Sequence, residues 1–192
     1  RSPPTMIQLR PYQTDAIARI RQTSQFSRAV LVVSPTGSGK TTIASEIARL
    51  TVARGKRVLW LAHRAELVDQ AFDRLREFGL IVGTVAAKTT RPPNPYAPVQ
   101  VASVQTLIAR NLRPQADVLI WDEAHHAPSD LWSGLATDYA SSLLLGFTAT
   151  PERSDGRGLG AVYTRIVTAA TVRQLVELGS LVPCDIRAPS DR

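Results

Sequence analysis

The chain has 192 residues, of which 44% are hydrophobic and 20% charged, and its formal net charge is +7. This composition argues against a disordered chain, and the length is enough for one domain with its own core. No apolar run approaches the roughly 20 residues of a membrane helix, and a single cysteine, Cys184, excludes an internal disulfide. We therefore expect a cytoplasmic protein without membrane contact. The basic balance is compatible with a phosphate-rich partner but does not require one.

Strand-like apolar runs alternate with helix-like segments along the chain. Apolar spacing and stop signals predict helices at residues 11–22, 43–53, 64–78 and 171–178. Short apolar runs predict strands at residues 29–33, 57–62, 80–86, 99–102, 118–121 and 143–147. A proline-rich stretch at residues 88–98 predicts a mobile surface loop. Continuous apolar strands between helices indicate an α/β fold, with a mainly parallel sheet and helices on both faces.

Residues 34–41 read Ser-Pro-Thr-Gly-Ser-Gly-Lys-Thr and lie between an apolar strand and a helix-forming segment. Strand, glycine-rich turn and helix are the context of a phosphate-binding loop, although Ser34 stands where such loops usually begin with glycine. Lys40 supplies a charge for the β- and γ-phosphates, and Thr41 a hydroxyl for Mg²⁺. We therefore expect ATP and Mg²⁺ as cofactors, held by Pro35, Thr36, Gly37, Ser38, Gly39, Lys40, Thr41 and Thr42.

Two carboxylates, Asp122 and Glu123, directly follow the apolar strand at residues 118–121. Carboxylates at the carboxyl end of a parallel strand lie at the mouth of the site, where Asp122 can reach the Mg²⁺ that Thr41 also serves. Glu123 is placed to orient or deprotonate the attacking water. The candidate catalytic residues are thus Lys40, Asp122 and Glu123. The neighbouring histidines point in different directions without a third ligand, so we expect no transition-metal site.

The segment Asp122-Glu123-Ala124-His125 resembles the DEAH form of motif II of superfamily 2 helicases and translocases. Other motifs of this family follow in the same order. Residues 9–13 resemble the Q-motif region, which implies that Gln13 hydrogen-bonds the adenine and that Arg10 or Tyr12 packs on it. The fold implied by the resemblance is a RecA-like P-loop NTPase domain.

Two further segments resemble family motifs that line the nucleic-acid channel. Residues 62–70 are similar to motif Ia, and residues 101–107 to the segment with Ser/Thr-Gln-Thr. The resemblance implies contacts with the sugar–phosphate backbone from His63, Arg64, Ser103, Gln105 and Thr106. Hydroxyls, helix-start N–H groups and an arginine suit phosphate contact without base reading. Helix caps at Ser103 and Thr106, and a solvated charge at Arg64, are alternative interpretations.

Residues 146–151 resemble motif III, which implies that Thr148 and Thr150 couple the ATP site, through His125 and Glu123, to the polymer site. Residues 152–158 and 181–183 resemble the bacterial type III restriction subunit and RadD-like branch of the superfamily, which acts mostly on DNA.

The resemblance covers only the first of the two RecA-like lobes of a family motor. We expect one domain at residues 1–183, and a tail or the start of a linker at residues 184–192. The second lobe, expected in cis, would carry the arginine finger. This chain alone should therefore bind nucleotide but hydrolyse it slowly or not at all.

These observations predict the N-terminal motor lobe of an ATP-dependent nucleic-acid helicase or translocase, acting on DNA in preference to RNA. An RNA motor is the first alternative, because backbone contacts separate the two polymers only through the 2′-OH. A P-loop phosphotransferase acting on a small metabolite is the second, although it does not predict the motif at residues 148–150. The third is a non-catalytic nucleotide- or DNA-binding module that regulates a partner.

Overall fold

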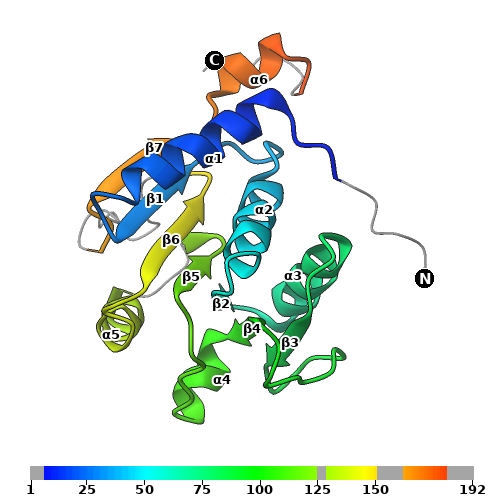
Figure 1. Cartoon of the computed structure of the whole chain (residues 1–192), viewed down its shortest axis with the longest axis vertical. Helices are drawn as coiled ribbons and strands as arrows, with labels where there is room; N and C mark the ends of the chain where they lie inside the picture. The colour runs from blue at the N-terminus through cyan, green and yellow to red at the C-terminus, as the bar shows by residue number, and fades with distance from the viewer. Residues whose placement is uncertain (1–6, 125–128, 151–161, 181–192) are drawn as a thin grey trace, which may run out of the picture.

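Parallel strands form the centre of the molecule. In chain order they are β1 (Ala29–Val33), β2 (Val58–Ala62), β3 (Val82–Val85), β4 (Val99–Ser103), β5 (Val118–Trp121), β6 (Leu143–Thr148) and β7 (Arg165–Thr168). They form one seven-stranded sheet in the order β3-β4-β2-β5-β6-β1-β7, in which each neighbouring pair is parallel (Figure 1). This computed structural model describes residues 7–124, 129–150 and 162–180.

Helices cover both faces of the sheet. One face is covered by α1 (Pro11–Thr23), α2 (Lys40–Val52) and α3 (Ala65–Glu77), and the other by α4 (Val104–Ala109) and α5 (Ser129–Asp138). A short helix, α6 (Val172–Glu177), follows β7. Among the residues that the structure describes, no helix is both long and apolar enough to cross a bilayer.

The central strands are apolar on both faces because each face belongs to a core of its own. In β2, Trp60 packs against the helices of the first face, whereas Leu59 and Leu61 point into the second core. All three side chains are buried. Burying a large apolar side chain contributes about 1.5–3 kcal/mol, so both layers stabilise the sheet. This arrangement explains why these strands read as continuous apolar runs rather than as alternating ones.

The expected α/β architecture is confirmed, and every expected helix and strand is present with small shifts at its ends. Three elements were not predicted, namely α4, α5 and β7. Helix α4 has six residues and starts directly after β4, so it is too short for a clear apolar period. Strand β7 is an edge strand with three exposed residues out of four, which gives no apolar run.

The proline-rich loop at residues 88–98 contacts α3 and the sheet. Arg91 forms an ion pair with Asp73 of α3, and its guanidinium lies over the ring of Phe72 at 5.9 Å from the centroid. At the other end of the loop, Gln100 Nε2 donates to the carbonyls of Asn94 (2.8 Å) and Ala97 (3.1 Å). These contacts hold the loop against α3 and the sheet.

Gly146 in β6 lies between Leu31 of β1 and Trp121 of β5, and the ring of Tyr163 packs directly against it. A Cβ atom at Gly146 would lie 2.2 Å from Oη and 2.3 Å from Cζ of Tyr163, a residue with 4% exposure. We expect Gly146→Ala to destabilise the chain by about 1–3 kcal/mol, because the rigid ring must move within a packed core. Urea unfolding measures this change.

Gly134→Ala is the matched control, because it makes the same chemical change at an exposed position of α5 where a Cβ meets nothing within 4 Å. This variant should keep or raise the free energy of unfolding, by up to about 1 kcal/mol from helix propensity. Equal stability of the two variants would contradict the packing assigned to Tyr163.

Candidate functional site

The loop between β1 and α2 has the backbone geometry of an anion site. Gly37 and Gly39 adopt φ angles of 79° and 77°, in the left-handed region that favours glycine. Gly39 is the N-cap of α2, and no side chain caps the first turn of this helix. The N–H groups and the positive end of a 13-residue helix therefore face the loop.

The start of α2 meets the end of β5 at this loop, although the two segments lie far apart in sequence. Thr41 Oγ1 donates to Asp122 Oδ2 at 3.4 Å. Lys40 is buried, and its Nζ donates to the Ser34 carbonyl at 3.3 Å and lies 3.9 Å from Glu123 Oε1. The four residues expected to bind phosphate, bind Mg²⁺ and activate water are thus brought together.

Asp122 is a half-buried carboxylate beside a second acid. Burial first, and the Glu123 carboxylate second, raise the pKa of Asp122 to about 6. Three groups favour its charged form, namely the Glu123 N–H, which donates to Asp122 Oδ1 at 3.1 Å, the Lys40 ammonium and the Thr41 hydroxyl. A cation at Asp122 would remove the electrostatic penalty that remains.

Glu123 has a φ of 53°, which a non-glycine residue seldom adopts. Such a conformation costs about 1–3 kcal/mol and is concentrated at functional sites. Here it turns the chain sharply after β5, so that Asp122 contacts Thr41 while the Glu123 side chain approaches Lys40.

The oxygen atoms at this edge fit Mg²⁺ better than a transition metal. Within residues 7–124, 129–150 and 162–180, no group of three or more His, Cys, Asp or Glu side chains could hold a metal. Mg²⁺ does not need such a group, because it is usually bound by one or two protein oxygens together with phosphates and water. Thr41 and Asp122 supply two such oxygens.

Two serine hydroxyls at the loop are buried without a hydrogen-bond partner in the described part of the chain, those of Ser34 and Ser38. Buried hydroxyls without a partner are uncommon in folded proteins. The unused donors, the uncapped helix start and the buried ammonium of Lys40 together fit a phosphate group.

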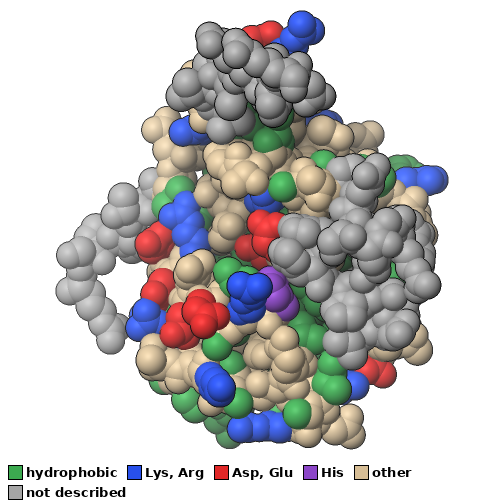
Figure 2. All heavy atoms as spheres, turned by 180° about the vertical axis from the view of Figure 1, so that it is seen from behind, with side chains coloured by type: hydrophobic (Ala, Val, Ile, Leu, Met, Phe, Trp, Pro, Cys, Tyr) green, Lys and Arg blue, Asp and Glu red, His purple; other side chains and the backbone are tan. Residues whose placement is uncertain are grey.

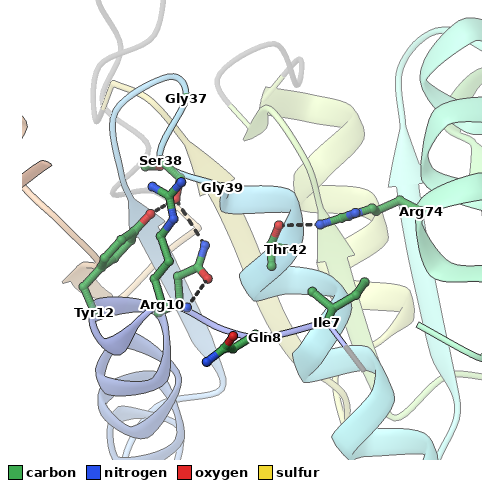
Figure 3. Close-up of a pocket in the computed structure, with 10 residues that line it drawn as sticks. Ile7, Gln8, Arg10, Tyr12, Gly37, Ser38, Gly39, Thr42 and Arg74 are labelled. Carbon is green, nitrogen blue, oxygen red and sulfur yellow. Dashed lines mark hydrogen bonds between the residues drawn. The ribbon is translucent and has the colours of Figure 1, made fainter. Parts of the chain in front are cut away.

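A second pocket, of about 190 Å³, lies beside the loop, and the start of α1 and one residue of α3 form its walls (Figure 3). Tyr12 Oη donates to the Ser38 carbonyl at 2.5 Å, and Gln13 Nε2 approaches the same carbonyl at 3.5 Å. Gln13 Oε1 accepts from the Arg10 N–H at 2.9 Å. All three residues predicted to contact adenine line this pocket, but both ends of the Gln13 amide are engaged with the protein.

Arg74 of α3 also lines this pocket and was not predicted from the sequence. Its Nη2 donates to Thr42 Oγ1 at 2.8 Å, and its guanidinium lies 5.2 Å from the centroid of the Phe78 ring. Figure 3 shows Arg74 reaching across from α3 to Thr42. The contact depends on how α3 packs beside α2, which no local sequence pattern specifies.

A wider cleft, of about 560 Å³, opens on the other side of the loop, where β2, β5 and β6 end. Its lining residues are Thr36, His63, Arg64, Glu66, Leu67, Glu123, Ala149 and Thr150. Figure 2, which shows the molecule from behind, has a histidine with basic and acidic side chains around it on this face. The cleft joins residues expected at the ATP site to residues expected at the nucleic-acid site.

The predicted nucleic-acid residues fall into two groups. Gln105 Nε2 donates to the His63 carbonyl at 2.6 Å, and Ser103 Oγ donates to Gln105 Oε1 at 2.8 Å, so these residues connect the ends of β2 and β4. Thr106 is different because it is buried and its hydroxyl accepts from the Ala87 N–H at 3.1 Å. This bond ties α4 to the chain after β3, and the predicted phosphate contact of Thr106 stays a prediction.

The predicted coupling residues surround the end of β6. Thr148 is buried, and its Oγ1 donates to the Thr150 carbonyl at 2.6 Å and accepts from the Thr150 N–H at 3.2 Å. These bonds form a turn that places Thr150 in the wider cleft. The third coupling residue, His125, lies outside the described residues, as does the predicted boundary at residues 183 and 184.

Comparison with known proteins identifies the family. The family of the type III restriction enzyme, res subunit, matches residues 6–153. The 51.5 kDa protein of Lactococcus phage (isolate 7-9) is 32% identical over 153 residues, which are 80% of this chain and 31% of that protein. The DNA 3'-5' translocase XPB2 of Sulfurisphaera tokodaii is 30% identical over 179 residues, which are 89% of this chain and 37% of that protein. The chain thus spans about a third of the length of these relatives.

Among solved structures, the UvsW helicase from bacteriophage T4 matches with a TM-score of 0.69 and 19% identity, over 84% of this chain and 60% of that one. This likeness confirms the expected RecA-like fold. The family match covers most of the chain, including the phosphate-binding loop and the two carboxylates after β5. The chain therefore belongs to the type III restriction enzyme, res subunit family, which is a family of superfamily 2 helicases, and it has a RecA-like fold.

Proposed function

We propose that this chain is the N-terminal motor lobe of a DNA helicase or translocase and binds Mg-ATP at the carboxyl edge of its sheet. One observation carries the proposal. The phosphate-binding loop and the acidic end of β5 meet through the Thr41–Asp122 contact, with Lys40 between the loop carbonyl and Glu123. Phosphate, metal and water chemistry need these groups within a few ångströms of one another.

Each residue has a distinct proposed role. Lys40 neutralises the β- and γ-phosphates, while Thr41 and Asp122 hold Mg²⁺, which when bound screens the charge of the transferring phosphoryl group. Glu123 now faces the Lys40 ammonium at 3.9 Å. With phosphates bound at Lys40, the Glu123 carboxylate would orient the attacking water and accept its proton.

We propose the pocket beside α1 as the adenine site, with Gln13, Tyr12 and Arg10 on its wall. Gln13 would exchange its 3.5 Å contact with Ser38 for the base, since this contact is at the limit of a hydrogen bond. The wider cleft is the proposed path of the nucleic-acid backbone, contacted by His63, Arg64 and neighbours at Ser103 and Gln105.

DNA is the proposed polymer, supported by the name of XPB2 as a DNA translocase. A second RecA-like lobe in cis is proposed because the chain spans about a third of its curated relatives. We place the domain at residues 1–183 and the start of the linker at residues 184–192. The family match gives no support to a phosphotransferase acting on a small metabolite.

The proposed site predicts that two substitutions differ in their effect on the affinity for Mg-ATP. Lys40→Ala should weaken Mg-ATP binding at least about tenfold, because it removes a buried charge from the phosphates. Glu123→Gln should keep the affinity within about threefold of the wild-type value, because this carboxylate acts on the attacking water rather than on bound ATP. Titration with a fluorescent ATP analogue measures both. Lys56→Ala, an exposed lysine outside the site, is the control, and equal affinities of the Lys40 and Lys56 variants would refute the assignment.

Turnover should depend on the second lobe. The chain alone is expected to hydrolyse ATP negligibly with single-stranded DNA, duplex DNA or RNA. The longer protein that includes the second lobe should turn over about 10³-fold faster or more, since an arginine finger contributes about that much. DNA should stimulate it more than RNA, and Glu123→Gln should abolish the stimulated rate. Robust turnover by the chain alone would contradict the half-motor proposal, and stimulation by RNA alone would replace DNA with RNA.

The raised pKa of Asp122 predicts that the metal-free chain is less stable above pH 6 than near pH 4. The pKa of about 6 exceeds the value of an unfolded aspartate, so the folded chain holds the proton more tightly than the unfolded chain. The free energy of unfolding should therefore decrease, by about 3 kcal/mol from this residue, as the pH rises from about 4 to above 6. Asp122→Asn should remove this decrease.

Urea unfolding in EDTA across this pH range measures the effect. The exposed Asp15 provides a matched control, and Asp15→Asn should leave the pH dependence unchanged. Identical profiles of wild type and Asp122→Asn would show that Asp122 does not carry the buried charge.

A further inference from the structure

An apolar groove of about 600 Å³ lies on the α1–α2 face, near the amino ends of the strands and therefore at the end of the sheet opposite the nucleotide site. Helices α1 and α2 form its sides, and the starts of β5 and β6 form its floor. Figure 1 shows β6 between these two helices. The groove is remote from the phosphate-binding loop, because its strand residues belong to the amino ends of strands whose carboxyl ends carry the site. Its role is therefore independent of the proposed function.

The interior of the groove is apolar. Apolar side chains line it in i, i+3 spacing on both helices, with Ile17 and Ile20 on α1 and Ile47 and Leu50 on α2. Ile20 is buried, whereas Ile17, Ile47 and Leu50 are half-buried. Leu143 of β6 lies between them. Apolar side chains that remain in contact with water lose the free energy that burial would release, so an apolar occupant is favoured.

The charges around the groove are mostly positive. Arg21, Arg54 and Lys56 are exposed on its lining, and the described residues give none of these three side chains an ion pair. Asp117 is the one acidic residue of the lining, and its Oδ2 already accepts from the Arg57 N–H at 2.8 Å. The complementary occupant thus carries an apolar stripe with carboxylates beside it.

Other ways of filling the groove fit less well. Adding a strand is excluded, because β5 and β6 each pair with a neighbour on both sides. Single-stranded nucleic acid binds through stacked aromatic residues, and no aromatic side chain is among the described residues that line this groove. A channel between two helices with i, i+3 apolar rows is instead the geometry that accepts a third helix.

We propose that this groove docks an acidic amphipathic helix of a partner protein. The apolar residues at positions i, i+3 or i+4 and i+7 of that helix contact Ile17, Ile47 and Leu50. Its flanking Asp and Glu side chains pair with Arg21, Arg54 and Lys56. The motor lobe would then carry a protein-binding site on the side away from its nucleotide.

Selection from a phage-displayed library of helical peptides without charge bias tests the proposal. The wild-type chain is the target, and the double variant R54E/K56E is the comparison. Both residues are exposed and unpaired, so the variant should fold, which its thermal unfolding and ATP binding verify. The matched control, R110E/R173E, makes the same charge change at exposed arginines outside the groove.

We expect the enriched peptides to have an apolar stripe flanked by Asp and Glu, and to bind R54E/K56E about tenfold more weakly than wild type. The affinity of these peptides for R110E/R173E should stay within about twofold of the wild-type value. Added salt should weaken peptide binding to the wild-type chain. Failure to enrich any peptide, enrichment of peptides without acidic residues, or equal loss in both variants would overturn the proposal. Self-association of the chain that R54E/K56E abolishes would also overturn it, because the occupant would then be a second copy.

Discussion

The common direction of the seven strands is the constraint on which the rest of the molecule depends. Because the sheet is parallel throughout, the chain leaves every strand at the same edge, and the connections after β1, β2, β5 and β6 meet there. The loop after β1, the two carboxylates and the threonines at the end of β6 owe their proximity to this topology. The two apolar cores that bury both faces of the sheet hold the edge rigid, so the site can be assembled before any ligand arrives.

The carboxylates at this edge are in less favourable environments than the residues of the apolar cores. Partial burial and the neighbouring Glu123 carboxylate raise the pKa of Asp122, while Glu123 adopts a backbone conformation unfavourable for its residue type. Both features destabilise the free protein. A bound cation would favour the charged form of Asp122, and the backbone conformation of Glu123 would position its carboxylate for the proposed chemistry. The groove on the α1–α2 face has a different character, since exposed cations surround half-buried apolar residues without crowding one another. The same fold thus presents the edge proposed to bind Mg-ATP and a separate surface suited to an acidic helix.

The sequence predicted those parts that have local signals. The loop at residues 34–41, the acidic strand end and the long apolar runs were recognisable because glycine geometry, strand ends and burial follow from neighbouring residues. Arg74 was missed because its contact with Thr42 arises from helix packing. The bond between the Thr106 hydroxyl and the Ala87 N–H was not foreseen, because it joins residues that are far apart in the sequence. The ion pair between Arg91 and Asp73, which holds one end of the loop at residues 88–98, was not predicted because it is long-range.

Calorimetric titration of this chain with ATP, in Mg²⁺ and in EDTA, tests most directly whether the loop and the acidic strand end form one metal–nucleotide site. The measurement is a double-mutant cycle of Thr41→Ala and Asp122→Asn. If both side chains hold the same ion, their effects on affinity should be non-additive in Mg²⁺, with a coupling of about 0.5–3 kcal/mol, and the coupling should vanish in EDTA. Absence of ATP binding by the wild-type chain, or the same coupling with and without Mg²⁺, would contradict the account.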